Sequence, residues 1–321
     1  MATTMEKSVS TLGQLSARRR FANNGMSVVI YLSFAIAVIP LVWLSVTVVT
    51  RGMQRFFVDA DGNHNFNLDF LEQSMRGVFG GMPEGGIIHA VWGTLLITLA
   101  ATIISVPIGL LTSIYLVEYG QGRLKKMVTF FVDVMTGIPS IVAGLFAYAV
   151  FAIVVGPGTK LGIVGAVALS VLMIPVVVRA TEEMLRLVPN ELREASYALG
   201  VPKWLTIVKV VMRTAMAGIT TGVTLAIARV IGETAPLLIA VGAADSMNLN
   251  LFEGRMMTLP VYIVAEWRKG EQPCNDPGIP CVPEITEMRA WAAALVLILI
   301  VMALNLIARL ISKYFSPKTG R

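Results

Sequence analysis

Long apolar segments constrain this 321-residue chain more than any other feature. The hydrocarbon core of a bilayer is about 30 Å thick, and a helix needs roughly 20 apolar residues to cross it. Segments that meet or approach this length are residues 26–50, 88–117, 127–155, 161–178, 207–231 and 290–312. Backbone polar groups inside lipid must find their partners within the chain. We therefore expect an all-α polytopic membrane protein with six transmembrane helices.

Composition and charge agree with this fold class. Hydrophobic residues make up 55% of the chain and charged residues only 14%, whereas soluble domains carry about 25% charged residues. Lys and Arg concentrate in alternate loops, which predicts a multi-pass protein of the plasma (inner) membrane with both termini in the cytoplasm. We attribute the net charge of +6 to this topology and to contacts with membrane lipid headgroups. No basic run is interleaved with aromatic residues, so a nucleic-acid partner is not expected.

The spans divide the chain into expected regions. These are a cytoplasmic tail at 1–25, a first helix with an external loop at 26–87, a membrane core at 88–312, and a cytoplasmic tail at 313–321. Within the core we expect an external loop at 242–289, which holds the only two cysteines, Cys274 and Cys281. On an oxidising outer face they can form a disulfide that pins this loop. No His lies nearby, and no metal site is predicted.

The most polar stretch, EEMLRLVPNELREASYALGVPKWLTIVKVV, lies between the fourth and fifth spans. Pro189 and Glu191 suit a helix start, Gly200 suits a helix end, and Pro202 suits the start of a second helix that continues into the fifth span. Leu192, Ala195, Leu199 and Trp204 supply an apolar surface. Such a helix, near 189–204, binds either lipid or a protein partner. Its polar face carries both signs of charge, which favours a protein.

This polar segment resembles the EAA loop of ABC importer permeases. Glu194, Ala195, Ser196 and Gly200 match the motif, while Arg213 stands where the family has Pro, which predicts a less kinked helix start. The resemblance implies a coupling helix that enters a cleft of an ATP-binding subunit. The residues assigned to this coupling are Glu191, Glu194, Ala195, Ser196, Leu199 and Gly200. A plain connecting hairpin is the alternative interpretation.

The chain contains no G-x-x-x-x-G-K-[ST] motif. That motif forms the loop that cradles nucleotide phosphates. We therefore expect a transporter subunit rather than an enzyme, with no cofactor in this chain and with ATP and Mg bound by a partner.

The segment LAIARVIGETAPLL places two ionisable residues, Arg229 and Glu233, inside the fifth span or at its end. Ionisable groups in a span are costly and are candidates for function by default. Their i, i+4 spacing predicts a shared helical face, and a structural ion pair is the alternative. Gly232 and Pro236 predict a broken helix, with Pro236 opening a half-helix toward an anion.

Phosphate suits this pair of side chains. At neutral pH phosphate still carries a proton, so Arg229 can donate two hydrogen bonds to its oxygens while Glu233 accepts its O–H. Sulfate has no proton to offer and would meet an unpaired like charge at Glu233.

The segments RVIGETAPLL and DVMTGIPSIVAGLFAY resemble the PstA-type permeases of high-affinity phosphate importers, over most of residues 92–309. This resemblance implies the type I ABC importer permease (MetI-like) fold and a substrate path through Arg229, Glu233 and Thr234. Thr136 and Ser140 could also line this path, or serve only in helix packing. The implied partners are two copies of an ATP-binding subunit, a second homologous phosphate permease and an external phosphate-binding protein.

The sequence leaves two other functions open. One is import of another oxyanion, such as sulfate or molybdate, by the same fold, which Glu233 disfavours. The other is a secondary transporter or channel, which should show an internal repeat and would leave the coupling motif unexplained.

Overall fold

The computed structural model describes residues 17–63, 65–274 and 278–315. The chain divides into two compact units, Met1–Thr50 and Arg51–Arg321. Helix α2 makes up the described part of the first unit; it begins at Ala17 and continues past the end of that unit to Gln54, so it is longer than the predicted span at 26–50. Most of its large apolar side chains are exposed, as expected of a helix that lies in lipid.

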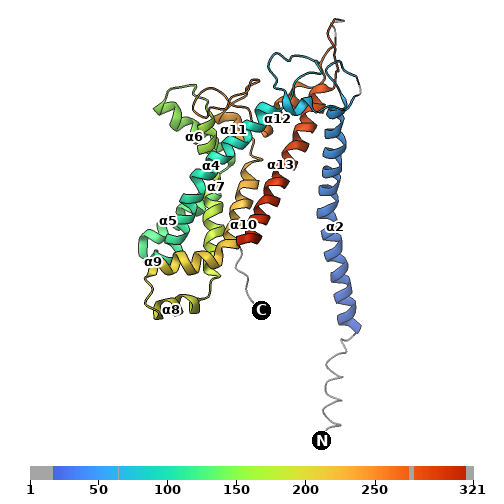
Figure 1. Cartoon of the computed structure of the whole chain (residues 1–321). Helices are drawn as coiled ribbons and strands as arrows, with labels where there is room; N and C mark the ends of the chain where they lie inside the picture. Colours follow the sequence, from blue (N-terminus) through green and yellow to red (C-terminus); the bar gives the residue numbers. More distant parts are fainter. Residues whose placement is uncertain (1–16, 64, 275–277, 316–321) are drawn as a thin grey trace. The chain divides into compact units, whose positions relative to one another are not determined.

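In the described part of the second unit the regular elements are all helical, and they follow one another along the chain as shown in Figure 1. They are η1 (Arg55–Phe57), α3 (Asp69–Glu72), α4 (Ile88–Ile114), η2 (Tyr115–Tyr119), α5 (Gly122–Thr136), α6 (Ser140–Val154), α7 (Gly162–Arg186), α8 (Asn190–Ala198), α9 (Lys203–Thr206), η3 (Ile207–Val211), α10 (Met212–Val230), α11 (Ala235–Ala240), α12 (Leu259–Lys269) and α13 (Ile285–Phe315). Both η2 and η3 are π-helical turns. Each prolongs a membrane helix at one end, which agrees with the predicted second and fifth spans.

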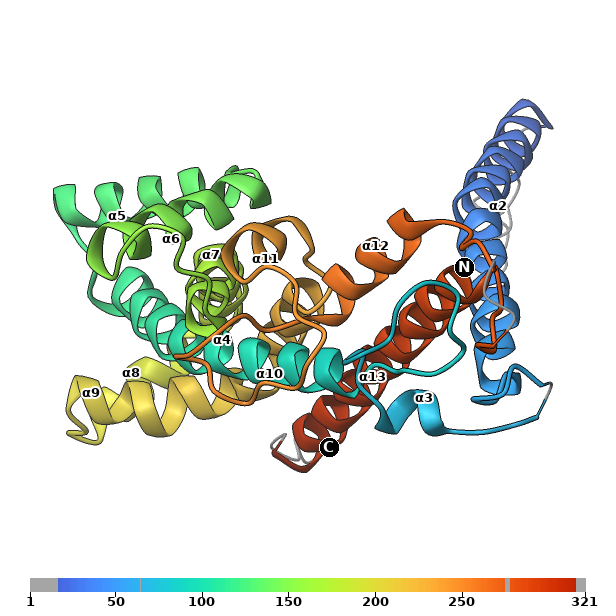
Figure 2. The ribbon, with the colours of Figure 1, turned by 90° about the horizontal axis from the view of Figure 1, so that it is seen from above.

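Helix α7 forms the centre of the bundle. In its most apolar stretch of 18 residues 61% of the residues are buried, against 33% or less in the other single helices long enough to cross a membrane. Viewed from above, α7 lies among α4, α5, α6, α10 and α11 (Figure 2). It also runs to Arg186, about two turns beyond the predicted end at residue 178. The charged residues after Val178 were assigned to a loop, and this was wrong because they continue the helix.

The predicted third span, residues 127–155, is not one straight helix. It consists of α5 and α6, which meet at an angle of 109°. The break falls at Gly137–Pro139, because Pro139 cannot donate a backbone hydrogen bond and Gly137 ends α5. Among the described residues, five single helices are long and apolar enough to cross a membrane, and the bent pair makes a sixth span if it is counted as one. The predicted fold class, an all-α polytopic membrane protein, is confirmed.

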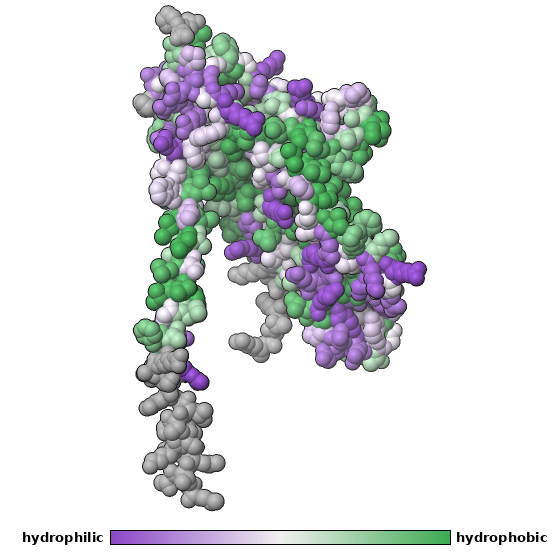
Figure 3. Space-filling view, turned by 180° about the vertical axis from the view of Figure 1, so that it is seen from behind, coloured by the Kyte–Doolittle hydropathy of each residue, from purple (hydrophilic) through white to green (hydrophobic). Residues whose placement is uncertain are grey.

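The two ends of this unit carry different structures. Helices α8 and α9 lie at one end. Helix α12 lies at the other end, together with two long loops, at residues 73–87 and 278–284 (Figure 1). Apolar surface fills the space between these polar ends (Figure 3). Helix α12 lies within the segment predicted as an external loop, and the sequence analysis did not predict it.

Candidate functional site

The first part of the candidate site is the break between α10 and α11. Helix α10 ends at Val230, and the backbone N–H of Glu233 donates to the Val230 carbonyl at 3.1 Å. Thr234 is the N-cap of α11, with Pro236 in its first turn. The predicted helix break after Arg229 is therefore confirmed. The predicted shared helical face is wrong, because Glu233 lies beyond the end of α10.

Arg229 and Glu233 do not form an ion pair in the described part of the chain. Arg229 is exposed, and Glu233 and Thr234 are half-buried. The structure therefore gives no support to the alternative interpretation of a structural ion pair. Both charged groups remain available to a ligand or to another subunit.

Helix α11 contains only six residues. A helix of less than two turns sums few peptide dipoles and supplies a weak field at its N-terminus. The predicted role of this half-helix as an anion site therefore carries little weight, and the charged side chains are the stronger feature.

The second part of the site is the break between α5 and α6, which is brought to α11 by a close backbone contact. A Cβ atom at Gly144 would lie 2.6 Å from the Cα and 2.8 Å from the carbonyl oxygen of Pro236. Only glycine allows this approach of α6 to α11. Gly137 has no such neighbour, since a Cβ at Gly137 would lie no closer than 3.5 Å to another atom, the Val134 carbonyl oxygen of its own helix.

The second break carries two hydroxyl groups that were predicted to line the path or to serve in helix packing, those of Thr136 and Ser140. Thr136 donates from Oγ1 to the Val132 carbonyl of its own helix at 2.9 Å, which is the packing role left open above. Ser140 is the first residue of α6 and is half-buried. Among the described residues, no hydrogen bond joins Thr136 or Ser140 to Arg229, Glu233 or Thr234.

The coupling segment folds as the sequence predicts. Helix α8 begins after Pro189 and ends at the C-cap Leu199. Gly200 has a φ of +75°, and its N–H donates to the Tyr197 carbonyl at 2.9 Å, while the Val201 N–H donates to the Ser196 carbonyl at 3.2 Å. These two bonds form a Schellman motif, which needs the left-handed conformation that glycine adopts without strain.

Most of the assigned coupling residues lie on the surface. Leu199 is 83% exposed, which leaves an apolar side chain open to a partner, and the residues exposed beside it are Glu191, Glu194 and Ala195. Ser196 differs, because it is buried and its hydroxyl bonds to that of Thr206 at 2.9 Å. Ser196 therefore joins α8 to α9 and does not face a partner.

Sequence reasoning missed the role of Arg193. Its guanidinium points inward and binds Glu118 at 2.9 Å. The two residues are 75 positions apart, and no local pattern in the sequence marks them as a pair. Only the folded arrangement, which brings η2 beside α8, shows it.

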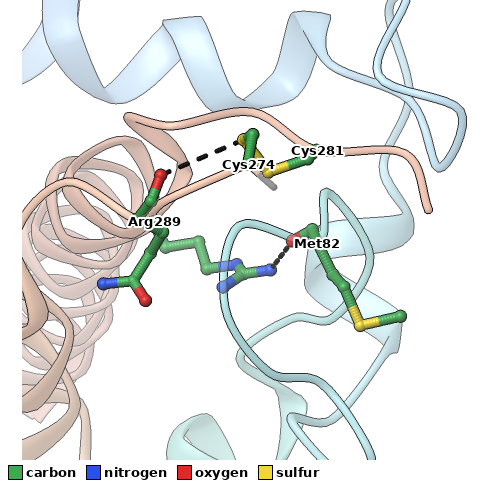
Figure 4. The surroundings of a disulfide bond; sticks show 5 residues. Met82, Cys274, Cys281 and Arg289 are labelled. Carbon is green, nitrogen blue, oxygen red and sulfur yellow. Dashed lines mark hydrogen bonds between the residues drawn. A yellow bond between two sulfur atoms is a disulfide. The ribbon is translucent and has the colours of Figure 1, made fainter. Parts of the chain in front are cut away.

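The opposite end of the unit is held by a disulfide and by a buried arginine. Cys274 and Cys281 are bonded to each other, and Val282 N–H donates to the Gly81 carbonyl at 2.8 Å. Arg289 is 1% exposed and donates to the backbone carbonyls of Met82 and Glu84. Figure 4 shows the disulfide above this contact. The two long loops are thus fastened together.

Asp133 of α5 binds Arg179 of α7 in an ion pair. Arg179 also binds Glu182 at 2.7 Å, and Glu182 binds Arg186 at 2.6 Å. This chain of charges fastens α5 to α7. No group of three or more His, Cys, Asp or Glu residues that could hold a metal ion occurs among the described residues.

The chain matches known protein families over most of its length. The family model described as binding-protein-dependent transport system inner membrane component matches residues 105–321. Phosphate transport system permease protein PstA 1 of Mycobacterium tuberculosis is 47% identical over 297 residues, which cover 92% of this chain and 90% of that protein. Phosphate transport system permease protein PstA of Pasteurella multocida is 36% identical, and the match covers 91% of this chain and 95% of that protein.

Solved structures share the fold at lower identity. An inward-facing structure of the MetNI methionine ABC transporter has a chain that matches with a TM-score of 0.55 and 20% identity, over 72% of this chain and 96% of that chain. A bacterial alginate ABC transporter, solved with an alginate-bound periplasmic protein, matches with a TM-score of 0.58 and 12% identity, over 91% of this chain and 96% of that chain. The predicted MetI-like permease fold is therefore confirmed.

Proposed function

Because the chain belongs to the family of binding-protein-dependent transport system inner membrane components, and within it to the PstA-type permeases, we propose that it is the membrane subunit of an ATP-driven importer of inorganic phosphate. The observation that carries the substrate is the 47% identity to a phosphate transport permease over 92% of the chain. The subunit is not an enzyme, since ATP hydrolysis belongs to a partner. It resides in the inner membrane as a multi-pass protein.

The break between α10 and α11 supports a role in phosphate passage. Arg229 is charged, exposed and without an ion-pair partner in the described structure. A guanidinium can donate two parallel hydrogen bonds to phosphate oxygens. Glu233 can accept the phosphate O–H, which sulfate lacks. We assign Arg229, Glu233 and Thr234 to the path, and Thr136 and Ser140 to its wall on the α5–α6 break.

The exposure of Arg229 favours a path formed between two subunits. A single chain leaves this charge open, although an unpaired charge inside lipid is costly. A second homologous permease that packs against α10 would enclose the charge in a polar passage. This proposal accounts for the second permease implied by the sequence.

Helix α8 then couples the passage to ATP. Its exposed Leu199 and its carboxylates suit a cleft of an ATP-binding subunit. We propose two copies of this subunit, which bind ATP and Mg, and a phosphate-binding protein at the opposite end of the bundle. In this arrangement α8 and both termini face the cytoplasm.

Transport by the whole complex tests the proposal. Intact cells that lack every other phosphate importer are used, so that the complex is not inserted inside out. Uptake of radiolabelled phosphate by these cells is measured with and without excess sulfate. We expect uptake that depends on this chain and that unlabelled phosphate, but not sulfate, suppresses. Equal suppression by sulfate would assign a different oxyanion, and uptake independent of a partner ATPase would assign a secondary transporter.

A further inference from the structure

Arg193 of the coupling helix α8 makes contacts with three separate parts of the chain. Its Nη2 atom binds the Glu118 carboxylate at 2.9 Å and the Leu185 carbonyl at 3.0 Å. Its Nη1 atom donates to the Val188 carbonyl at 2.6 Å. The Glu118 side chain is 6% exposed and that of Arg193 13%. One guanidinium therefore joins α8 to the end of α7 and to the turn η2.

A second cation fastens the other side of the coupling segment to the same turn. Lys203, the first residue of α9, donates from Nζ to the backbone carbonyl of Glu118. The same ammonium lies over the Tyr119 ring, 4.7 Å from its centroid, where a cation is attracted to the ring face. Both halves of the segment, α8 and α9, are thus attached to η2.

The turn η2 is the direct continuation of α4, and α4 packs against the central helix α7. η2 is a π-helical turn, an uncommon conformation that interrupts the regular helix. A movement imposed on α8 by a partner would therefore reach α4 through Glu118. Energetic coupling travels through such connected polar and packed contacts.

We propose that the Glu118–Arg193 ion pair is the rigid link that carries the movement of the coupling helix into α4. This inference rests on the proposed function, since it requires an ATPase that moves α8. Glu118 and Arg193 are positioning residues, because neither is placed on the phosphate path. The carboxylate orients the guanidinium, and the guanidinium fixes α8 against the ends of α4 and α7.

A plain stabilising contact would behave differently from a link. Loss of a stabilising contact lowers the amount of assembled complex but leaves each assembled complex coupled. Loss of a link leaves the complex assembled and ATP hydrolysed, with fewer phosphate ions moved for each ATP. The ratio of phosphate transported to ATP hydrolysed therefore separates the two roles.

The test uses the complete complex in proteoliposomes, with the ATP-binding subunit, the second permease and the phosphate-binding protein. Glu118→Gln removes the charge and keeps the size of the side chain. We expect this variant to lower the ratio about tenfold or more, because a buried charge loses its partner, while basal ATP hydrolysis per complex stays near the wild-type rate. Glu183→Gln is the matched control, since Glu183 is exposed on α7 and forms no ion pair in the described structure, and we expect it to leave the ratio unchanged.

A covalent bridge gives a second measurement that does not depend on the folding of the Gln variant. Glu118 and Arg193 are both replaced by Cys in a chain that also carries Cys274→Ser and Cys281→Ser. A bifunctional thiol reagent then joins the side chains at positions 118 and 193. We expect the unbridged protein to be poorly coupled and the bridged protein to recover the wild-type ratio. A normal ratio in Glu118→Gln or in the unbridged protein, or a bridged protein that stays as poorly coupled as the unbridged one, would overturn the proposal.

These outcomes are distinct from a failure of the proposed function. If the wild-type complex hydrolyses ATP in response to its binding protein but moves no phosphate, the substrate assignment fails. The link is then still measured as the stimulation of ATP hydrolysis by the binding protein, which Glu118→Gln should abolish and Glu183→Gln should keep.

Discussion

The backbone of Gly144 in α6 lies against that of Pro236 in α11, so that a Cβ at Gly144 would stand 2.6 Å from the Pro236 Cα. Each residue follows a break: Pro139 opens α6, and Thr234 opens α11. The contact therefore joins the two broken helices of the bundle at the point where regular backbone resumes. Breaks of this kind are tolerated at membrane depth where they are enclosed in protein or line a cavity.

Replacement of Gly144 by Ala should separate α6 from α11. The new methyl group would meet backbone atoms of Pro236, which cannot rotate away as a flexible side chain can. We expect a loss of stability of about 1–3 kcal/mol and a clear fall in phosphate uptake, measured as thermal denaturation in detergent and as uptake in cells. Gly137→Ala is the control in the neighbouring break, where the nearest atom is 3.5 Å away, and it should retain uptake. Equal effects of the two substitutions would argue against the contact.

Replacement of Gly200 by Val should disturb the end of the coupling helix. No atom lies within 4 Å of a Cβ built at this position, so the cost is conformational and amounts to about 1–2 kcal/mol for a side chain in the left-handed region. We expect the protein to insert in the membrane while phosphate-stimulated ATP hydrolysis falls. Gly200→Asn is the matched variant, since Asn tolerates this conformation better, and it should keep most of the stimulation. Normal stimulation in Gly200→Val would show that the turn is not needed.

Local sequence signals predicted the parts of this structure that depend on local chemistry. The positions of Pro189, Gly200 and Pro202 predicted α8, its Schellman turn and the start of α9, because capping and turn conformations are decided within a few residues. Gly232 and Pro236 predicted the break after α10 for the same reason. The lengths of the apolar segments predicted where the membrane helices lie, but not the early start of α2 at Ala17 or the end of α7 at Arg186.

The parts that depend on distant contacts were not predicted. The break between α5 and α6 is local to Gly137–Pro139, but the size of the bend, 109°, is not contained in a hydropathy pattern. In the sequence Arg193 has the appearance of a solvated charge, because its partner Glu118 is 75 positions away and lies beside it only in the folded chain. Helix α12 was missed because its LPVYIVAEWRK sequence is too short for a span and lies in a long connecting segment.

Oxidation of Cys274 and Cys281 should be visible in intact cells. If this loop faces the outside, a membrane-impermeant thiol reagent should label the two residues only after reduction, as measured by mass shift. Substitution of both by Ser removes a loop-closing bond worth about 2 kcal/mol. The Arg289 contacts to Met82 and Glu84 still hold the loops together, so we expect at most a modest loss of uptake. Labelling without reduction would show that the disulfide is absent in the cell.

Glu233→Gln should change selectivity more than rate. The amide keeps the size of the side chain but adds donors, so it no longer rejects an oxyanion that lacks a proton. We expect sulfate to compete with labelled phosphate in this variant and not in the wild type. The double substitution Arg229→Gln with Glu233→Gln should not restore uptake, because no ion pair joins the two residues in the described structure. Recovery of uptake in the double variant would instead show that each charge only neutralises the other.

We propose above that phosphate passes the break after α10 by way of Arg229. The most direct test is phosphate uptake by cells that carry a single substitution of this residue. Arg229→Gln should lower radiolabelled phosphate uptake about tenfold to a hundredfold, since it removes charged hydrogen-bond donors, in cells that lack other phosphate importers. Arg213→Gln makes the same change at an exposed position at the opposite end of α10 and should leave uptake near the wild-type rate at equal amounts of protein in the membrane. Wild-type uptake in Arg229→Gln, at matched protein levels, would contradict the account.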